Sequence, residues 1–152
     1  MSENATGGRD RAGRLYTPQV LTLAVELADF PLTADLPVRG RARSQSCGST
    51  LDVGLGLGRD RHIDRVGIQA TACAVGQASA AIFARHAVGR SEAEIARGRK
   101  EIEAWLAATR TMPDWPDLET IAPAREYPAR HGAILLPWRA ATDALSNSGR
   151  PL

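Results

Sequence analysis

The sequence predicts a mixed α+β domain in which a three-stranded antiparallel meander sheet packs against about four to five helices. A period-two alternation of leucine or valine with glycine or aspartate runs through residues 51–57, and a second alternation covers residues 66–70. A turn at residues 58–61 separates the two runs. Helical periodicity at residues 17–28 and again from residue 91 onward places helices on both sides of this strand region.

The first element is a helix that follows a polar tail. Residues 1–14 contain no apolar cluster to bury, so we expect a disordered tail there. Because a chain of 152 residues usually forms one domain, a single domain is expected over residues 15–152. In the helix predicted over residues 17–28, Thr17 is the N-cap and Pro18 occupies the first helical position.

The strands are expected to bury one face of the sheet. In residues 51–57 the apolar positions are Leu51, Val53, Leu55 and Leu57. The glycines between them, at positions 54 and 56, are expected on the polar side or at a bend. A weaker first strand is predicted over residues 41–46 and ends at Cys47.

Helices account for most of the remaining chain. Residues 74–85 are mainly small, which lets a helix lie close against a sheet. Ser91 to Glu94 has the form of a capping box and opens a second helix, in which Ile95, Ile102, Trp105 and Leu106 share one face. A short helix is predicted over residues 117–122 and a last one over residues 130–145.

The composition argues against several classes of protein. A net charge of +2 is too small to indicate nucleic-acid binding, and the basic residues, of which only Lys100 is a lysine, are spread along the chain. No apolar run approaches the roughly 18 residues of a membrane span, and the N-terminus lacks the apolar core of a secretory signal. We therefore expect a cytoplasmic protein that binds neither nucleic acid nor membrane.

The sequence contains no pattern typical of an enzyme. The glycines at positions 54, 56 and 58 have the wrong spacing for a dinucleotide-binding loop. A Ser/His/Asp set cannot be assembled, and the G-x-S-x-G elbow is absent from the sequence. His62, His86 and His131 have no cysteine or second histidine at ligand spacing, so a structural role is expected for each.

The two cysteines are the strongest indication of chemistry. Cys47 follows the first predicted strand and Cys73 follows the third, and in a meander these strand ends lie at the same end of the sheet. Gly48 allows a tight loop after Cys47. Cys73 precedes a helix whose dipole favours a thiolate. The thiols are either ligands for a soft metal or an iron–sulfur cluster, or two small buried apolar groups, as most free cysteines are.

Three short motifs, in order, resemble those of the U-type iron–sulfur cluster assembly scaffolds, the NifU N-terminal, IscU and SufU family. Cys47-Gly48-Ser49 stands where that family has Cys-Gly-Asp. The run over residues 72–80 resembles its Gly-Cys-x-x-x-x-Ser-x-Ser segment. Residues 128–138 resemble its Pro-x-Arg/Lys-x-x-Cys motif and the Leu-x-Trp that follows. The resemblance extends from about residue 16 to residue 145 and implies the same fold.

The resemblance implies a ligand set of three cysteines and one aspartate, of which this chain keeps half. Cys47 and Cys73 match the family pattern, whereas Ser49 stands at the aspartate position and Ala133 at the third cysteine position. A [2Fe–2S] cluster or a tetrahedral zinc ion takes four donors. The remaining donors would therefore come from water, a small thiol or a partner subunit.

Two further side chains are weaker candidate ligands. Ser49 carries a hydroxyl beside Cys47 in the sequence. His131 lies two residues before Ala133, and on a helix that offset points a side chain to nearly the opposite side. His131 would therefore take part only if the last helix begins later than predicted.

By resemblance, the chain is expected to be a non-enzymatic scaffold or carrier for iron–sulfur cluster assembly. It would bind iron, a labile [2Fe–2S] cluster or zinc through Cys47 and Cys73. A cysteine desulfurase and cluster-receiving proteins would be its partners, and a homodimer is one way to complete the ligand set. One alternative is a degenerate, cluster-free member that acts as a protein-interaction or regulatory module. Another is a thiol carrier that passes sulfur as a persulfide.

Overall fold

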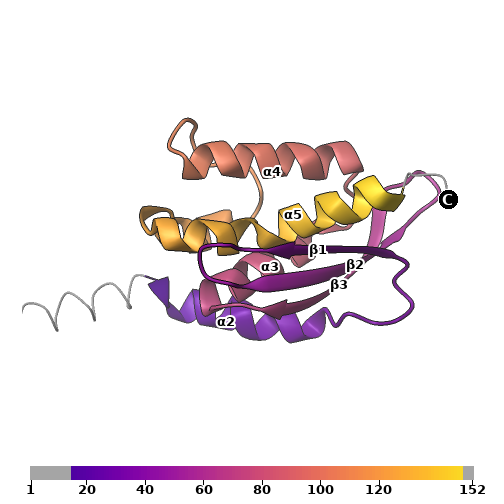
Figure 1. Cartoon of the computed structure of the whole chain (residues 1–152), viewed down its shortest axis with the longest axis horizontal. Coiled ribbons are helices and arrows are strands. Elements are labelled where there is room, and N and C mark those ends of the chain that lie inside the picture. The colour runs from indigo at the N-terminus through magenta and orange to yellow at the C-terminus, as the bar shows by residue number, and fades with distance from the viewer. Residues whose placement is uncertain (1–14, 149–152) are drawn as a thin grey trace, which may run out of the picture.

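The computed structural model describes residues 15–148, so the tail expected over residues 1–14 lies outside the described part of the chain. Helix α2 and the 3₁₀ helix η1 precede the sheet, and the helices from α3 onward follow it (Figure 1). The elements are α2 (Pro18–Glu26), the 3₁₀ helix η1 (Leu27–Asp29), β1 (Val38–Arg43), β2 (Thr50–Leu57), β3 (Ile63–Thr71), α3 (Ala74–Ala87), α4 (Glu92–Leu106), the 3₁₀ helices η2 (Leu118–Glu126) and η3 (Pro128–Arg130), and α5 (His131–Ser148). The predicted α+β class is confirmed.

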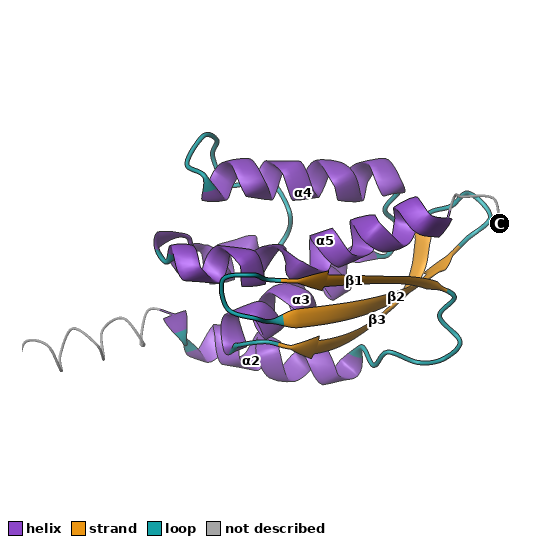
Figure 2. Cartoon of the chain, viewed as in Figure 1, coloured by secondary structure: helices purple, strands orange, loops and turns teal. Residues whose placement is uncertain are grey.

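The three strands form the predicted antiparallel meander, in the order β1-β2-β3 (Figure 2). Thr50, at the start of β2, pairs with Arg43 at the end of β1 and with Thr71 at the end of β3. Helices α3 and α5 pack against the sheet, and α4 lies on the far side of α5 (Figure 1). The chain segments that precede β2 and follow β3 therefore leave the sheet side by side.

Both predicted helix caps are present. Thr17 caps α2 by accepting a hydrogen bond from the backbone N–H of Val20, with Oγ1 and N 3.2 Å apart. Ser91 caps α4 by accepting from the N–H of Glu94 at 3.2 Å. Such side-chain acceptors satisfy N–H groups that the first helical turn leaves free. The buried residues of α4 are the four apolar positions that the sequence placed on one face.

The prediction for the first strand was wrong in position. Strand β1 begins and ends earlier than residues 41–46, and Cys47 lies in a turn instead of closing the strand. The N–H of Ser44 still reaches the carbonyl of Ser49, at 2.8 Å, before the chain turns. Gly48 closes this turn with φ of 70°, a left-handed conformation that glycine adopts without steric cost.

The expected polar side of β2 is also covered. Gly54 and Gly67 pair across β2 and β3, and both lie beneath the segment of residues 31–36. A Cβ at Gly54 would come within 2.6 Å of Leu32 and 2.8 Å of Leu36. The sequence predicted only one buried face because the glycines alternate with apolar residues and were therefore assigned to the polar side of the strand. Here glycine instead leaves room for the returning chain.

The last helices begin near their predicted positions. The short helix predicted over residues 117–122 is the 3₁₀ helix η2, which continues to Glu126. Helix α5 starts at His131, one residue after the predicted start, because the 3₁₀ helix η3 precedes it. No helix within residues 15–148 is long and apolar enough to span a membrane.

Candidate functional site

Cys47 and Cys73 line one shallow hollow at the end of the sheet. The hollow has a volume of about 280 Å³, and its other lining residues are Gly48, Ser49, Thr71, Ala72 and Arg130. We call it the cysteine hollow. Because Thr50 pairs with Thr71, the antiparallel register brings the residues before β2 next to those after β3. The predicted proximity of the two thiols follows from this register, although Cys47 and Cys73 are far apart in the sequence.

A tight loop holds Cys47. The N–H of Gly48 donates to the carbonyl of Ser44 at 2.8 Å, which closes the turn around Cys47. The loop rests on the first turn of α5, where Ser44 lies so close to Gly132 that a Cβ at this position would clash with it. The hydroxyl of Ser46 also donates to the carbonyl of Ala129, at 3.3 Å. The position of Cys47 therefore depends on residues more than eighty positions away.

The hydroxyls of two serines surround the Cys47 sulfur. Cys47 Sγ lies 3.3 Å from Ser44 Oγ and 3.0 Å from Ser49 Oγ. Hydrogen bonding from Ser44, then from Ser49, holds the pKa of Cys47 below its ordinary value, with a smaller contribution from the positive charge of Arg130. Hydrogen bonds and nearby positive charge both favour the ionised form. Cys47 is exposed, so this polarised sulfur is accessible to solvent.

Cys73 occupies a different setting on the opposite wall. It is the N-cap residue of α3, and its carbonyl accepts from the N–H of Gln77 at 2.9 Å. Its side chain is half-buried and packs partly against the hydrophobic core.

Among residues 15–148, Arg130 is the one cation that lines the hollow, and sequence reasoning named it only as part of a motif. It lies at the end of η3, and its guanidinium donates to the hydroxyl of Tyr16 at 3.3 Å. The Pro128 to Arg130 segment that resembles the scaffold motif thus places a positive charge in the hollow, where it acts on Cys47. No local pattern in the sequence could have revealed this contact, because it depends on how α5 docks.

The weaker candidate ligands are placed differently from each other. Ser49 lies in the hollow and is buried. His131 does not line the hollow, and its Nε2 lies 2.6 Å from the carbonyl oxygen of Arg125. Ala133 is fully buried on α5, facing Gly76 of α3, where a Cβ would lie 3.3 Å away. Within residues 15–148, no group of three His, Cys, Asp or Glu side chains converges on one point.

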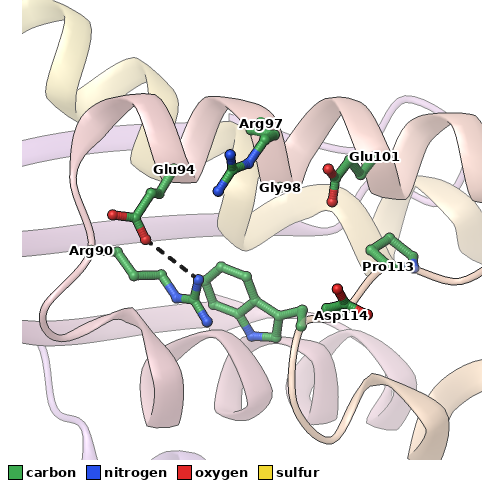
Figure 3. A pocket seen from close by; sticks show the side chains of 8 residues that line it. Arg90, Glu94, Arg97, Gly98, Glu101, Pro113 and Asp114 are labelled. Atoms are coloured by element: carbon green, nitrogen blue, oxygen red, sulfur yellow. Dashed lines mark ion pairs between the residues drawn. The ribbon is translucent and has the colours of Figure 1, made fainter.

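A second hollow, of about 360 Å³, lies under α4 and has a different character (Figure 3). The guanidinium of Arg90 lies 4.0 Å from the centre of the Trp115 ring and 3.7 Å from a Glu94 oxygen. Glu101 pairs with Arg110 at 3.4 Å. Most of its charges are therefore already paired, and neither a cysteine nor a histidine lines it. The cysteine hollow is the better candidate for chemistry.

Comparison with solved structures confirms the structural resemblance. The N-terminal part of a nitrogen-fixing NifU-like protein from Brucella abortus matches with a TM-score of 0.82 and 26% sequence identity, over 92% of this chain and 99% of that one. An iron–sulfur cluster assembly scaffold protein of the SUF system from Fervidobacterium islandicum matches with a TM-score of 0.75 and 20% identity, over 88% of this chain and 98% of that one. No protein-family model matches the sequence, and a comparison with curated proteins gave no match. The chain has the α+β fold of the NifU-like and SufU-like scaffolds.

Proposed function

We propose that this chain takes part in iron–sulfur cluster assembly as a scaffold or carrier that holds iron or a labile cluster through Cys47 and Cys73. The observation that carries the proposal is the cysteine hollow, where two thiols and one cation meet on a scaffold fold. Thiolates are the donors that iron–sulfur clusters take. The lowered pKa of Cys47 favours the form that binds.

The chain supplies only part of a ligand set. Two thiols and the hydroxyl of Ser49 line the hollow, and Arg130 offsets the negative charge that two thiolates and a cluster would bring. Because four donors are needed, the missing ones come from outside the chain in this proposal, from a small thiol or a second subunit. Cargo held by two protein thiolates exchanges more readily than cargo held by four, which suits transfer to a cluster-receiving protein.

The test is anaerobic reconstitution with ferrous iron, sulfide and a small thiol, followed by iron, sulfide and zinc analysis. We expect iron and sulfide near one equivalent per chain or per dimer, and loss of both in the Cys47→Ser/Cys73→Ser variant. The matched control is Ser146→Ala, on the exposed side of α5, which should retain the wild-type content. Negligible metal in wild type and double variant alike would remove the scaffold mechanism.

Restoring the family ligands sharpens the same test. A Ser49→Asp/Ala133→Cys variant would offer three thiols and a carboxylate, enough donors for a complete set. We expect it to hold iron and sulfide through gel filtration without added small thiol, whereas the wild type loses them. Equal losses from both proteins would contradict the idea that missing donors make the wild-type cargo labile. Circular dichroism should first show that the buried substitution at Ala133 leaves the fold intact.

The second candidate function is a cluster-free interaction module for a cysteine desulfurase or another assembly protein. The observation that favours it is the buried methyl group of Ala133 where the resemblance implies a third cysteine. This alternative expects Cys47→Ser/Cys73→Ser to leave binding to a cysteine desulfurase unchanged. Binding that disappears with the thiols would instead favour a role for them in sulfur or metal handling.

A further inference from the structure

A larger hollow, of about 520 Å³, follows the free edge of the sheet and is lined by arginines. Arg41 and Arg43 come from β1, Arg139 comes from α5, and Arg99 reaches in from α4. Figure 1 shows why these elements meet, since α5 lies between β1 and α4. We call this hollow the arginine groove.

Strand β1 directs toward the groove backbone groups that no neighbouring strand pairs. It pairs with β2 only, so its other edge is open within residues 15–148. The N–H of Ser44 points to β2, and in an antiparallel pair alternate residues point the other way. Arg41 and Arg43 accordingly direct their backbone groups outward. An exposed edge of this kind is a template for an added strand.

Two side chains of α5 already form hydrogen bonds with the backbone groups that an added strand would use. A carboxylate oxygen of Asp143 accepts from the backbone N–H of Arg41 at 3.1 Å. The guanidinium of Arg139 donates to the backbone carbonyl of Arg43 at 3.4 Å. Both groups are on or near the surface, so a competing strand can displace them at small cost.

The groove carries unbalanced positive charge. Arg41 pairs with Asp52 at 3.5 Å, and Arg99 pairs with Glu103 at 2.9 Å. Among the contacts of the described residues, Arg43 and Arg139 have no carboxylate within ion-pair distance. An incoming carboxylate therefore finds two guanidinium groups without a carboxylate partner beside this strand edge.

We propose that the arginine groove binds an acidic, extended polypeptide segment of a partner protein, which adds to β1 as a further strand. Backbone hydrogen bonds to Arg41 and Arg43 would give affinity, and carboxylates on alternate residues would meet Arg43 and Arg139. Nucleic acid fits less well, because the groove has no aromatic residue for base stacking and carboxylates lie among its arginines.

This surface is separate from the cysteine hollow. The two hollows share no lining residue, although both reach the loop after β1, where Gln45 lines the arginine groove and Cys47 lines the cysteine hollow. Binding of the acidic segment is therefore measured without metal, and its failure would leave the cluster proposal untouched. Conversely, a protein that holds no cluster can still bind such a segment.

The probe is a fluorescein-labelled peptide of about ten residues in which glutamate alternates with valine, long enough to span β1. Fluorescence anisotropy at low salt measures its binding to the full chain. A peptide with glutamine in place of glutamate should bind several-fold more weakly, because it loses the charge pairs with Arg43 and Arg139. We also expect affinity to fall as salt rises.

Two variants distinguish edge binding from general attraction. Arg43→Glu/Arg139→Glu should weaken binding by about tenfold or more, whereas the matched reversal Arg59→Glu/Arg97→Glu, outside the groove, should have little effect. Asp143→Asn should tighten binding about threefold, because it removes a repelling carboxylate and leaves only a neutral amide oxygen to hold the N–H of Arg41. Circular dichroism checks that each variant is folded.

Several results would overturn the proposal. They are no detectable peptide binding by wild type, equal loss in both double variants, weaker binding by Asp143→Asn, or amide shifts on labelled peptide that map away from Arg41 and Arg43. Tighter binding of a single-stranded oligonucleotide through Arg43 and Arg139 would replace the peptide with nucleic acid as the partner class.

Discussion

The two ends of helix α3 differ in their surroundings: one end packs into the core and the other carries a reactive group. Its C-terminal half carries Phe83, which stacks on Trp115 at 5.7 Å between ring centres and meets Trp138 edge-on at 5.5 Å. All three rings are buried, and we call them the aromatic cluster. Its N-terminal end carries Cys73, half-buried beside the exposed Cys47. Stability is concentrated at one end of the helix and reactive groups at the other, so each can be altered with little effect on the other.

Hydrogen bonding shows the same contrast. At the aromatic end, Trp115 Nε1 donates to the carbonyl of Ile82 at 3.2 Å, and Asp117 joins η2 to His86 and Arg85 of α3. At the cysteine end, the hydrogen bonds lie within a short loop and lower the pKa of one thiol, that of Cys47. Densely packed cores resist substitution, whereas polar surface loops tolerate it.

The largest expected effect is at the aromatic cluster. Phe83→Ala should lower the free energy of unfolding by about 3–5 kcal/mol, because a fully buried ring is lost and leaves a cavity. Urea denaturation measures the loss, with Val25→Ala, exposed on α2, as the control. The rate of Cys47 alkylation in the remaining folded protein should not change. A stability loss below about 1 kcal/mol would mean that the aromatic cluster does not hold α3 and α5 together.

A smaller effect is expected at Asp117, and it depends on pH. A hydrogen bond from His86, and then one from Arg85, hold the pKa of Asp117 below its ordinary value. A carboxyl group whose pKa is lowered in the folded state stabilises the fold above its unfolded pKa, and this contribution disappears as the pH falls through the folded value.

Asp117→Asn should therefore cost about 0.5–1 kcal/mol at neutral pH, a modest figure because the side chain is about one-third exposed. Asparagine tolerates the positive φ of this position, so the change tests charge more than backbone strain. The difference from wild type should shrink as the pH falls below the ordinary aspartate pKa and vanish once the pH is below the lowered pKa of folded Asp117. Thermal unfolding across pH measures it, with the exposed Asp114→Asn as control. A deficit that persists in acid would point to a steric cause.

The smallest effect on stability, but a clear one on reactivity, is expected at the cysteine end. Ser44→Ala and Ser49→Ala each remove a hydroxyl that lowers the pKa of Cys47, so this pKa should rise. Alkylation by iodoacetamide at neutral pH should slow by about threefold or more, and the rates should converge at high pH where the thiol is fully ionised. Ser146→Ala is the matched control. Unchanged rates would mean that the serines do not polarise the sulfur.

Much of the fold could be predicted because its signals are local. Thr17 and Ser91 mark helix starts through hydrogen bonds to residues three positions away, and alternation over residues 51–57 identifies β2. The approach of Cys47 to Cys73 could also be foreseen, since a meander leaves few ways to pair three successive strands. These features need only neighbouring residues and a simple topology.

Tertiary structure alone decided what surrounds those elements. Some of these surroundings arise where segments that are distant in the sequence meet, and others follow from the path of a loop. They are the segment that covers Gly54, the position of Arg130 beside the thiols, the serine contacts of Cys47 and the arginine groove. Periodicity reports which face of an element is apolar, but not which partner covers it. The sequence by itself determined the elements and the two thiols, whereas docking of α5 and the returning loops determined the environment in which those thiols act.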